Sequence, residues 1–315
     1  MATGIVGATG FIGSYLCQQL SCGHQALRIF ARGEAKISSL SNTQVFLGNL
    51  LSGPDCERFA SGLDVIHYLA HTNNPFNSDE DQAAGVALNL VPFLTLLSAI
   101  RRLASKPHIV YFSSGGAVYA PSPARVPYSE CDPCAPGTSY GILKLTAEQY
   151  LRLAAERGEL TATVLRVGNA YGTLLPQYRT QGLIGVALNQ ILHQKPVRVF
   201  GNAENVRDYV HLQDVTAMVK MASTPHRPFD IVNVGSGQGH SVNDVLSVIR
   251  DCHGSPFNTQ RDAGSAPWLP DWVVLDNSYA QREFGWIPGV SLRAGIAAML
   301  ADSNTELRAA AAVAK

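Results

Sequence analysis

The chain has little charge and no excess of either sign. Charged residues make up 15% of its 315 residues, and 24 Lys and Arg balance 24 Asp and Glu. A chain with no net charge has no global field that favours nucleic acid or an anionic membrane as a partner. We therefore expect it to bind neither nucleic acid nor a membrane.

Cysteines are few, and long apolar runs are absent. Six cysteines favour reduced thiols over a disulfide framework, and Cys131 and Cys134 have no second pair at zinc-ribbon spacing, so we expect no metal site. The most apolar helical stretch, residues 86–100, is too short to cross a bilayer. A strand-like run starts at residue 2 and leaves no room for a signal peptide, so we expect a cytoplasmic protein.

Apolar β-branched runs alternate with helical patterns through the first half of the chain. Such alternation predicts an α/β fold with a doubly wound parallel sheet, covered by helices on both faces. The strands are expected at 2–6, 26–30, 44–47, 64–69, 108–113 and 162–167, and the helices at 11–22, 55–61, 81–104 and 139–157.

The pattern becomes looser after residue 168. Shorter elements alternate with loops rich in Gly, Pro and Asn, which predicts a smaller C-terminal α/β lobe that binds substrate. We place the first domain at residues 1–168 and the second at 169–315, with a soft boundary because later segments could return to the first domain.

A glycine-rich turn follows the first expected strand and opens the first expected helix. Gly7, Gly10 and Gly13 permit a tight turn and a close approach of the backbone to a pyrophosphate at a helix N-terminus. The strand before the turn and the amphipathic helix after it predict a Rossmann dinucleotide site.

The second expected strand ends at Ala31 and Arg32. An acidic residue there would bind both ribose hydroxyls and specify NAD, whereas an arginine suits a 2′-phosphate. Arg32 also fits a solvated surface residue. The expected cofactor is therefore NAD or NADP.

Tyr140 and Lys144 are four residues apart in a helical pattern. This spacing places an ammonium beside a phenol on one helix face. A nearby positive charge favours the phenolate, so Lys144 and a cationic cofactor ring would lower the pKa of Tyr140 towards neutrality. The pair predicts a general acid/base.

With these motifs in this order, the chain resembles the extended short-chain dehydrogenases/reductases. The likeness is closest to the nucleotide-sugar 4-epimerases related to UDP-galactose 4-epimerase. It rests on residues 7–13, 48–50, 68–71, Asn89, 113–119, 140–144, 166–172 and 206–211.

The resemblance implies how the two ligands are held. The cofactor-binding residues would be Gly7, Thr9, Gly10, Phe11, Ile12, Gly13, Arg32, Asn49, Leu50, Leu69, Ala70, His71, Asn89, Tyr140 and Lys144. A nucleoside-diphosphate sugar would be bound by Ser114, Gly115, Tyr140, Asn169, Arg207 and Arg261. His71 fits a packing histidine as well.

The chain departs from the family pattern at Gly115. A Ser or Thr in that place orients the sugar hydroxyl in the family, so Ser114 or Ser113 would have to join Tyr140 and Lys144 in catalysis. Both serines also fit hydrogen bonding at a strand end.

The resemblance implies an NAD(P)-dependent epimerase that acts through a transient 4-keto sugar. An NADPH-dependent reductase of a 4-keto nucleotide sugar is the main alternative, and a catalytically inactive cofactor-binding protein is a further one. A dehydratase is disfavoured because Gly116 and Ala117 replace its acid/base carboxylates.

Dimers of this family form a four-helix seam, which implies a homodimer here. Val91, Leu94, Leu97 and Ile100 in the 81–104 helix fit such a seam, and they fit an intramolecular core nearly as well.

Overall fold

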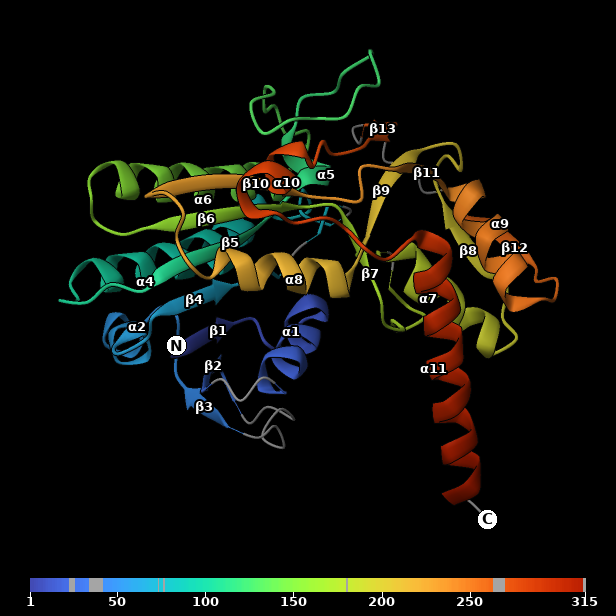
Figure 1. Ribbon diagram of the computed structural model, residues 1–315, viewed down its shortest axis with the longest axis horizontal. Helices are drawn as coiled ribbons and strands as arrows, with labels where there is room; N and C mark the ends of the chain where they lie inside the picture. Colours follow the sequence, from blue (N-terminus) through green and yellow to red (C-terminus); the bar gives the residue numbers. More distant parts are fainter. Residues whose placement is uncertain are drawn as a thin grey trace.

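The computed structural model describes residues 1–22, 26–33, 42–72, 74–75, 77–179, 181–262 and 270–313 (Figure 1). Within these residues, seven parallel strands form one sheet in the order β10-β6-β5-β4-β1-β2-β3. The strands are β1 (Thr3–Val6), β2 (Leu27–Ala31), β3 (Thr43–Leu47), β4 (Val65–Tyr68), β5 (His108–Ser114), β6 (Ala162–Val167) and β10 (Phe229–Val234).

Helices cover both faces of this sheet. On one face lie α1 (Phe11–Ser21), α8 (Leu212–Ala222) and α10 (Ser278–Phe284), whose apolar residues form one core with the strands. On the other lie α2 (Gly53–Ala60), α4 (Val91–Arg101) and α6 (Ser139–Glu156). The strands alternate between the two cores because successive side chains point to opposite faces. The doubly wound α/β fold predicted from the sequence is confirmed.

Two smaller sheets lie to one side of the main sheet in Figure 1, within the described residues. One contains β7 (Asn169–Tyr171), β9 (Val206–His211), β11 (Gly239–Ser241) and β13 (Trp272–Val273), and the other pairs β8 (Val197–Phe200) with β12 (Thr259–Asp262). The associated helices are α7 (Leu183–Leu192), α9 (Val242–His253) and α11 (Leu292–Val313).

The chain passes between these two regions more than once. Strand β10 pairs with β6 in the main sheet, although it follows β7, β8 and β9 in the sequence. Helices α8 and α10 pack on the main sheet in the same way. A split at residue 168 would therefore assign an edge strand of the main sheet to the second lobe, and the two-domain division stays a prediction.

The helix near the middle of the chain covers most of the range 81–104 that the sequence predicted. Helix α3 (Gln82–Gly85), a π-helical turn η1 (Val86–Leu90) and α4 join end to end. The resulting stretch Gln82–Arg101 has a mean hydropathy of 1.9 and is long and apolar enough to cross a membrane by length and composition alone. The expectation that the apolar stretch in this region is too short to cross a bilayer was therefore wrong. Its inner face packs in the protein core, as in many buried helices.

Candidate active site

The glycine turn joins β1 to α1 in a backbone path that side chains would block. Gly7 has a φ of +97°, and a Cβ there would lie 2.6 Å from the backbone nitrogen of Ala70. A Cβ on Gly13 would lie 2.2 Å from the carbonyl oxygen of Gly7. Both contacts are too close for real atoms, so the turn can pack against the end of β4 only with glycine at these two positions.

The N-terminus of α1 opens this turn towards a cleft. Gly10 caps the helix without a side chain, and a Cβ there would contact only the Gly7 carbonyl oxygen, at 3.3 Å. Uncapped N–H groups at a helix start bind anions such as phosphate. The turn therefore fits the pyrophosphate of a dinucleotide.

The cleft beside the turn has a volume of about 310 Å³ and runs between the main sheet and the β7 region. Twelve of the sequence-predicted site residues line it: Gly7, Gly10, Phe11, Ile12, Gly13, Leu69, His71, Ser113, Ser114, Tyr140, Lys144 and Asn169.

Tyr140 and Lys144 lie on one face of α6, as their spacing predicted. The Nζ of Lys144 lies 5.7 Å from the centre of the Tyr140 ring and donates a 2.7 Å hydrogen bond to the Phe112 carbonyl oxygen of β5. Ser114, the last residue of β5, hydrogen bonds with the Tyr140 side chain. The strand and the helix thus bring a phenol, a hydroxyl and an amine into one cleft.

The electrostatics of this pair differ from the sequence expectation. Burial raises the pKa of Tyr140 to about 12, and the hydrogen bond from Ser114 only partly opposes it. Burial also lowers the pKa of Lys144 to about 7. Lys144 is directed at a carbonyl oxygen instead of the phenol oxygen, so the protein groups alone do not bring Tyr140 near neutrality.

The two serines point in different directions. Ser113 donates its hydroxyl hydrogen bond to Glu148, which is fully buried on α6. Both serines bond to side chains of α6, and Ser114 is the one whose hydroxyl bonds with Tyr140. A Cβ on Gly115 would lie 2.6 Å from Leu275 Cδ1, and Gly115 is not among the residues that line the cleft.

His71 and Asn89 support the same region, His71 from the loop after β4 and Asn89 from η1. The His71 ring meets the Tyr140 ring edge to face, with centroids 4.8 Å apart, and burial lowers its pKa to about 2, so it is neutral. Its Nε2 is buried and has no protein partner. Asn89 accepts a 2.6 Å hydrogen bond from the Thr72 backbone and donates to the Gly85 carbonyl, which ties η1 to the loop after β4.

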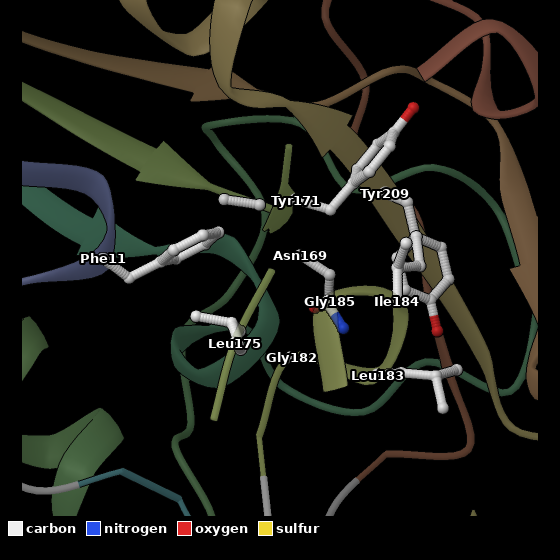
Figure 2. Close-up of a pocket in the computed structure, with 10 residues that line it drawn as sticks. Phe11, Asn169, Tyr171, Leu175, Gly182, Leu183, Ile184, Gly185 and Tyr209 are labelled. Atoms are coloured by element: carbon white, nitrogen blue, oxygen red, sulfur yellow. The ribbon is translucent and has the colours of Figure 1, made fainter. Parts of the chain in front are cut away.

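From the second lobe, Asn169 on β7 lines the cleft, whereas Arg207 on β9 is not among the residues that line it. Asn169 lines both the cleft and an adjoining small hollow, where Phe11 of α1 faces residues of β7 and β9 (Figure 2). Arg207 is half-buried, and burial lowers its pKa. Its guanidinium donates a 2.8 Å hydrogen bond to the carbonyl oxygen of the preceding residue, Val206.

Other predicted residues lie outside the lining of this cleft. Ala70 contacts the glycine turn, Thr9 is exposed in that turn, Arg32 is exposed directly after β2, and Arg261 is exposed on β12. Asn49 and Leu50 follow β3, and the Asn49 side chain accepts a hydrogen bond from the Leu51 backbone. The roles assigned to these residues stay predictions.

Sequence reasoning missed some groups that the structure places in or behind the cleft. Arg179, Gln181 and Gly182 line it from the loop before α7, where no motif or periodic pattern marked them. The sequence did contain a signal for Glu148, because a residue four positions after Lys144 lies on the same face of the helix.

Comparison with known proteins agrees with this geometry. The NAD dependent epimerase/dehydratase family matches residues 4–235. The chain is 29% identical to a UDP-glucose 4-epimerase from Mycolicibacterium smegmatis, over 94% of this chain and 96% of that protein. It is 31% identical to a dTDP-4-dehydro-6-deoxyglucose reductase from Escherichia coli, over 74% and 72%.

A solved structure of a UDP-glucose 4-epimerase from Thermus thermophilus, in complex with NAD, has a similar fold. Its TM-score is 0.86 at 26% identity, and the match covers 95% of this chain and 98% of that one. The predicted resemblance, enzyme class and nicotinamide cofactor are thereby confirmed at the level of the family. The chain belongs to the NAD-dependent epimerase/dehydratase family.

Proposed function

We propose that this chain is a 4-epimerase of a nucleoside-diphosphate sugar, with a UDP-sugar as substrate. The observation that carries the proposal is the meeting of Tyr140, Ser114 and Lys144 in the cleft that starts at the glycine turn. The full-length match to a UDP-glucose 4-epimerase supports the choice of substrate.

The residues around the cleft fit a dinucleotide. Gly10, Phe11 and Ile12 at the start of α1 would hold the pyrophosphate, and Lys144 would bind the nicotinamide ribose. Asn49 and Leu50 would flank the adenine, and Leu69, Ala70 and His71 would contact the central part. A bound nicotinamide would supply the redox chemistry, as acceptor and then donor of the hydride from the sugar C4.

Tyr140 would take the proton of the sugar 4-hydroxyl and give it back. Its pKa of about 12 must fall for this role, and two cationic groups near the phenol would lower it, Lys144 and the oxidised nicotinamide ring. Ser114 would share its hydrogen bond with the sugar hydroxyl and hold it against Tyr140.

Arg207 and Asn169 would anchor the diphosphate. Within the described residues the half-buried Arg207 guanidinium forms no salt bridge, although it lies in the field of Asp271, and its planar donors match the oxygens of two phosphoryl groups. Anchoring at the diphosphate leaves the sugar free to turn between the two hydride transfers, and this turn inverts C4.

The test is to denature the purified protein with heat, identify the released nucleotide, and assay intact protein with a panel of UDP-sugars. Retained NAD and conversion of a UDP-sugar to its 4-epimer without added reductant are expected. Retained nucleotide with no conversion of any nucleotide sugar would contradict the proposal and would favour an inactive cofactor-binding protein.

A ketoreductase is the second candidate, because the chain is also 31% identical to a dTDP-4-dehydro-6-deoxyglucose reductase. Exposed Arg32 directly after β2 is compatible with a 2′-phosphate and so with NADPH. Protein that is purified without nucleotide and consumes NADPH with a 4-keto nucleotide sugar would favour this function over the epimerase.

We further propose that the chain forms a homodimer through an apolar helix face made of Leu88, Val91, Ile142 and Leu153. These residues are 38–55% exposed on η1, α4 and α6, and η1 contacts α6. Leu97 and Ile100, which also fitted a seam, are buried inside the protein. A cytoplasmic location stays a prediction.

A further inference from the structure

A carboxylate lies buried behind the Tyr140–Lys144 pair. Glu148 follows Lys144 by one helical turn of α6, and its exposed fraction is 0%. Both residues lie on the inner side of the helix, and Lys144 is 4% exposed. A carboxylate is rarely buried completely unless it is paired, so its surroundings need an explanation.

Two side chains hold Glu148 in place. Arg166 of β6 donates from Nη2 to Oε2 at 2.7 Å and from Nε to both carboxylate oxygens at 3.3 Å. Ser113 of β5 donates its hydroxyl to Oε1. Arg166 is fixed in turn, because its guanidinium lies 4.8 Å from the Tyr119 ring centre and donates to the Glu130 carbonyl. The carboxylate is therefore held in one position by charged and polar donors.

Lys144 faces few groups that can stabilise its charge. On the β5 side it meets the Phe112 carbonyl and, at 5.2 Å, the centre of the Tyr111 ring. From the loop after β4 it faces neutral His71, and along α6 it faces Tyr140 and Glu148. Burial lowers the pKa of Lys144 to about 7, and the charge of Glu148 opposes that fall.

A buried ion pair is poor evidence for stability by itself, because apolar residues of similar volume often stabilise a core equally well. The position of this pair, one turn behind the amine of the active site, suggests a different use. We propose that Glu148 is a positioning residue whose fixed carboxylate raises the fraction of Lys144 that is protonated at neutral pH, so that Lys144 can act on Tyr140. This role rests on the function proposed for Lys144.

The direct test follows the titration of Lys144 by NMR in protein carrying ¹³C-labelled lysine. The chain has six lysines, so the Lys144 signal can be assigned with a Lys144→Arg variant. In Glu148→Gln, the amide still accepts hydrogen bonds from Arg166 but carries no charge, and the midpoint of Lys144 should fall by about one pH unit.

Two variants separate charge from packing. Glu156→Gln makes the same substitution at the exposed end of α6 and should leave the Lys144 midpoint unchanged. Glu148→Asp keeps the charge and should keep the midpoint near that of the unmodified protein. If Glu148→Gln does not fold, the double variant Glu148→Gln/Arg166→Met leaves no unpaired buried charge and should show a fall in the same direction, smaller because a positive charge is lost as well.

The pH profile of turnover gives a second readout in the holoenzyme. The loss of kcat at high pH should move to lower pH in Glu148→Gln by the same amount as the Lys144 midpoint. A folded variant whose Lys144 midpoint stays in place would overturn the proposal. A midpoint that moves in a protein that converts no nucleotide sugar would instead count against the proposed function alone.

Discussion

At the scale of single residues, two adjacent serines at the end of β5 have different tasks. Ser114 hydrogen bonds with Tyr140 in the cleft, whereas Ser113 is 6% exposed and donates to Glu148. Since the Ser113 hydroxyl is engaged by Glu148, we expect Ser114 to be the serine that bonds with the sugar hydroxyl.

We predict that alanine lowers kcat at one of these two positions and protein stability at the other. Ser114→Ala removes a hydrogen bond to the reacting phenol, so kcat should fall about 10- to 100-fold with little change in stability. Ser113→Ala removes a buried donor, so the free energy of unfolding should fall by roughly 1–3 kcal/mol with most activity retained. Steady-state kinetics and urea denaturation measure both, and equal losses of kcat in the two variants would contradict the assignment.

The glycine turn gives a second prediction at this scale. Gly13→Ala places a methyl group 2.2 Å from the Gly7 carbonyl oxygen, so the turn must shift and bound nucleotide should be lost. The nucleotide released by heat from each purified variant measures this effect. Gly62→Ala is the control for protein stability, because Gly62 has a φ of +73° but no atom near its added Cβ and lies away from the cleft. A Gly13→Ala protein that retains its nucleotide would refute the close packing described here.

Local spacing made part of the site predictable at this scale. Residues four apart on a helix and glycines in a strand–helix turn have fixed geometry, and so Tyr140, Lys144 and Gly7 were found from the sequence. The pKa of Tyr140 was not predictable, because burial depends on the packing of the whole cleft. The burial of Gly115 under Leu275 joins residues 160 positions apart, and no local pattern encodes it.

At the scale of elements, the long helix of residues 82–101 and helix α6 each have two apolar sides. The inner side packs in the core through residues such as Phe93 and Leu151, and the outer side exposes Val91 and Ile142. The helical period predicted an apolar face but could not tell which apolar residues were buried within one chain.

A dimer through the outer side predicts that a charge there separates the protomers. Val91→Glu, at a position that is 42% exposed, would bury an unpaired carboxylate in the interface, so the dimer should dissociate with little loss of monomer stability. Sedimentation velocity measures the change. Ile287→Glu is the control, because Ile287 is 70% exposed on another part of the surface. Equal masses for both variants would argue against this interface.

At the scale of the whole molecule, the alternation of strands and helices predicted the main sheet well, because each parallel strand needs a helical crossover. The seventh strand, β10, returns from the second lobe after some 60 residues, and its partner β6 cannot be inferred from its own sequence. The small sheets were less predictable, because strands such as β13 are only two residues long.

The buried histidines of the main sheet give a prediction for global stability. Burial lowers the pKa of His67 to about 3 and of His108 to about 4, whereas both titrate near 6.5 in an unfolded chain. Below pH 6.5 the unfolded chain binds protons that the folded protein does not. Their stabilising effect is complete above that pH and is lost as pH falls towards 4.

Each histidine should lower the free energy of unfolding by roughly 1.4 kcal/mol per pH unit in this range. Urea denaturation at pH 6.5 and 5.5 measures the loss. The His108→Gln side chain can keep hydrogen bonds to Thr161 and Thr163. In this variant the fall in the free energy of unfolding between the two pH values should be smaller by about the contribution of one histidine. A loss that is unchanged in His108→Gln would show that this histidine is not held neutral.

The central claim is that the phenol of Tyr140 exchanges the proton of the sugar 4-hydroxyl beside a bound nicotinamide. The most direct measurement compares purified Tyr140→Phe with the unmodified protein for bound nucleotide and for interconversion of a UDP-sugar and its 4-epimer. The expected result is a fall in turnover of about 10²- to 10⁴-fold with nucleotide content unchanged. A Tyr140→Phe protein that keeps its full turnover would contradict the account.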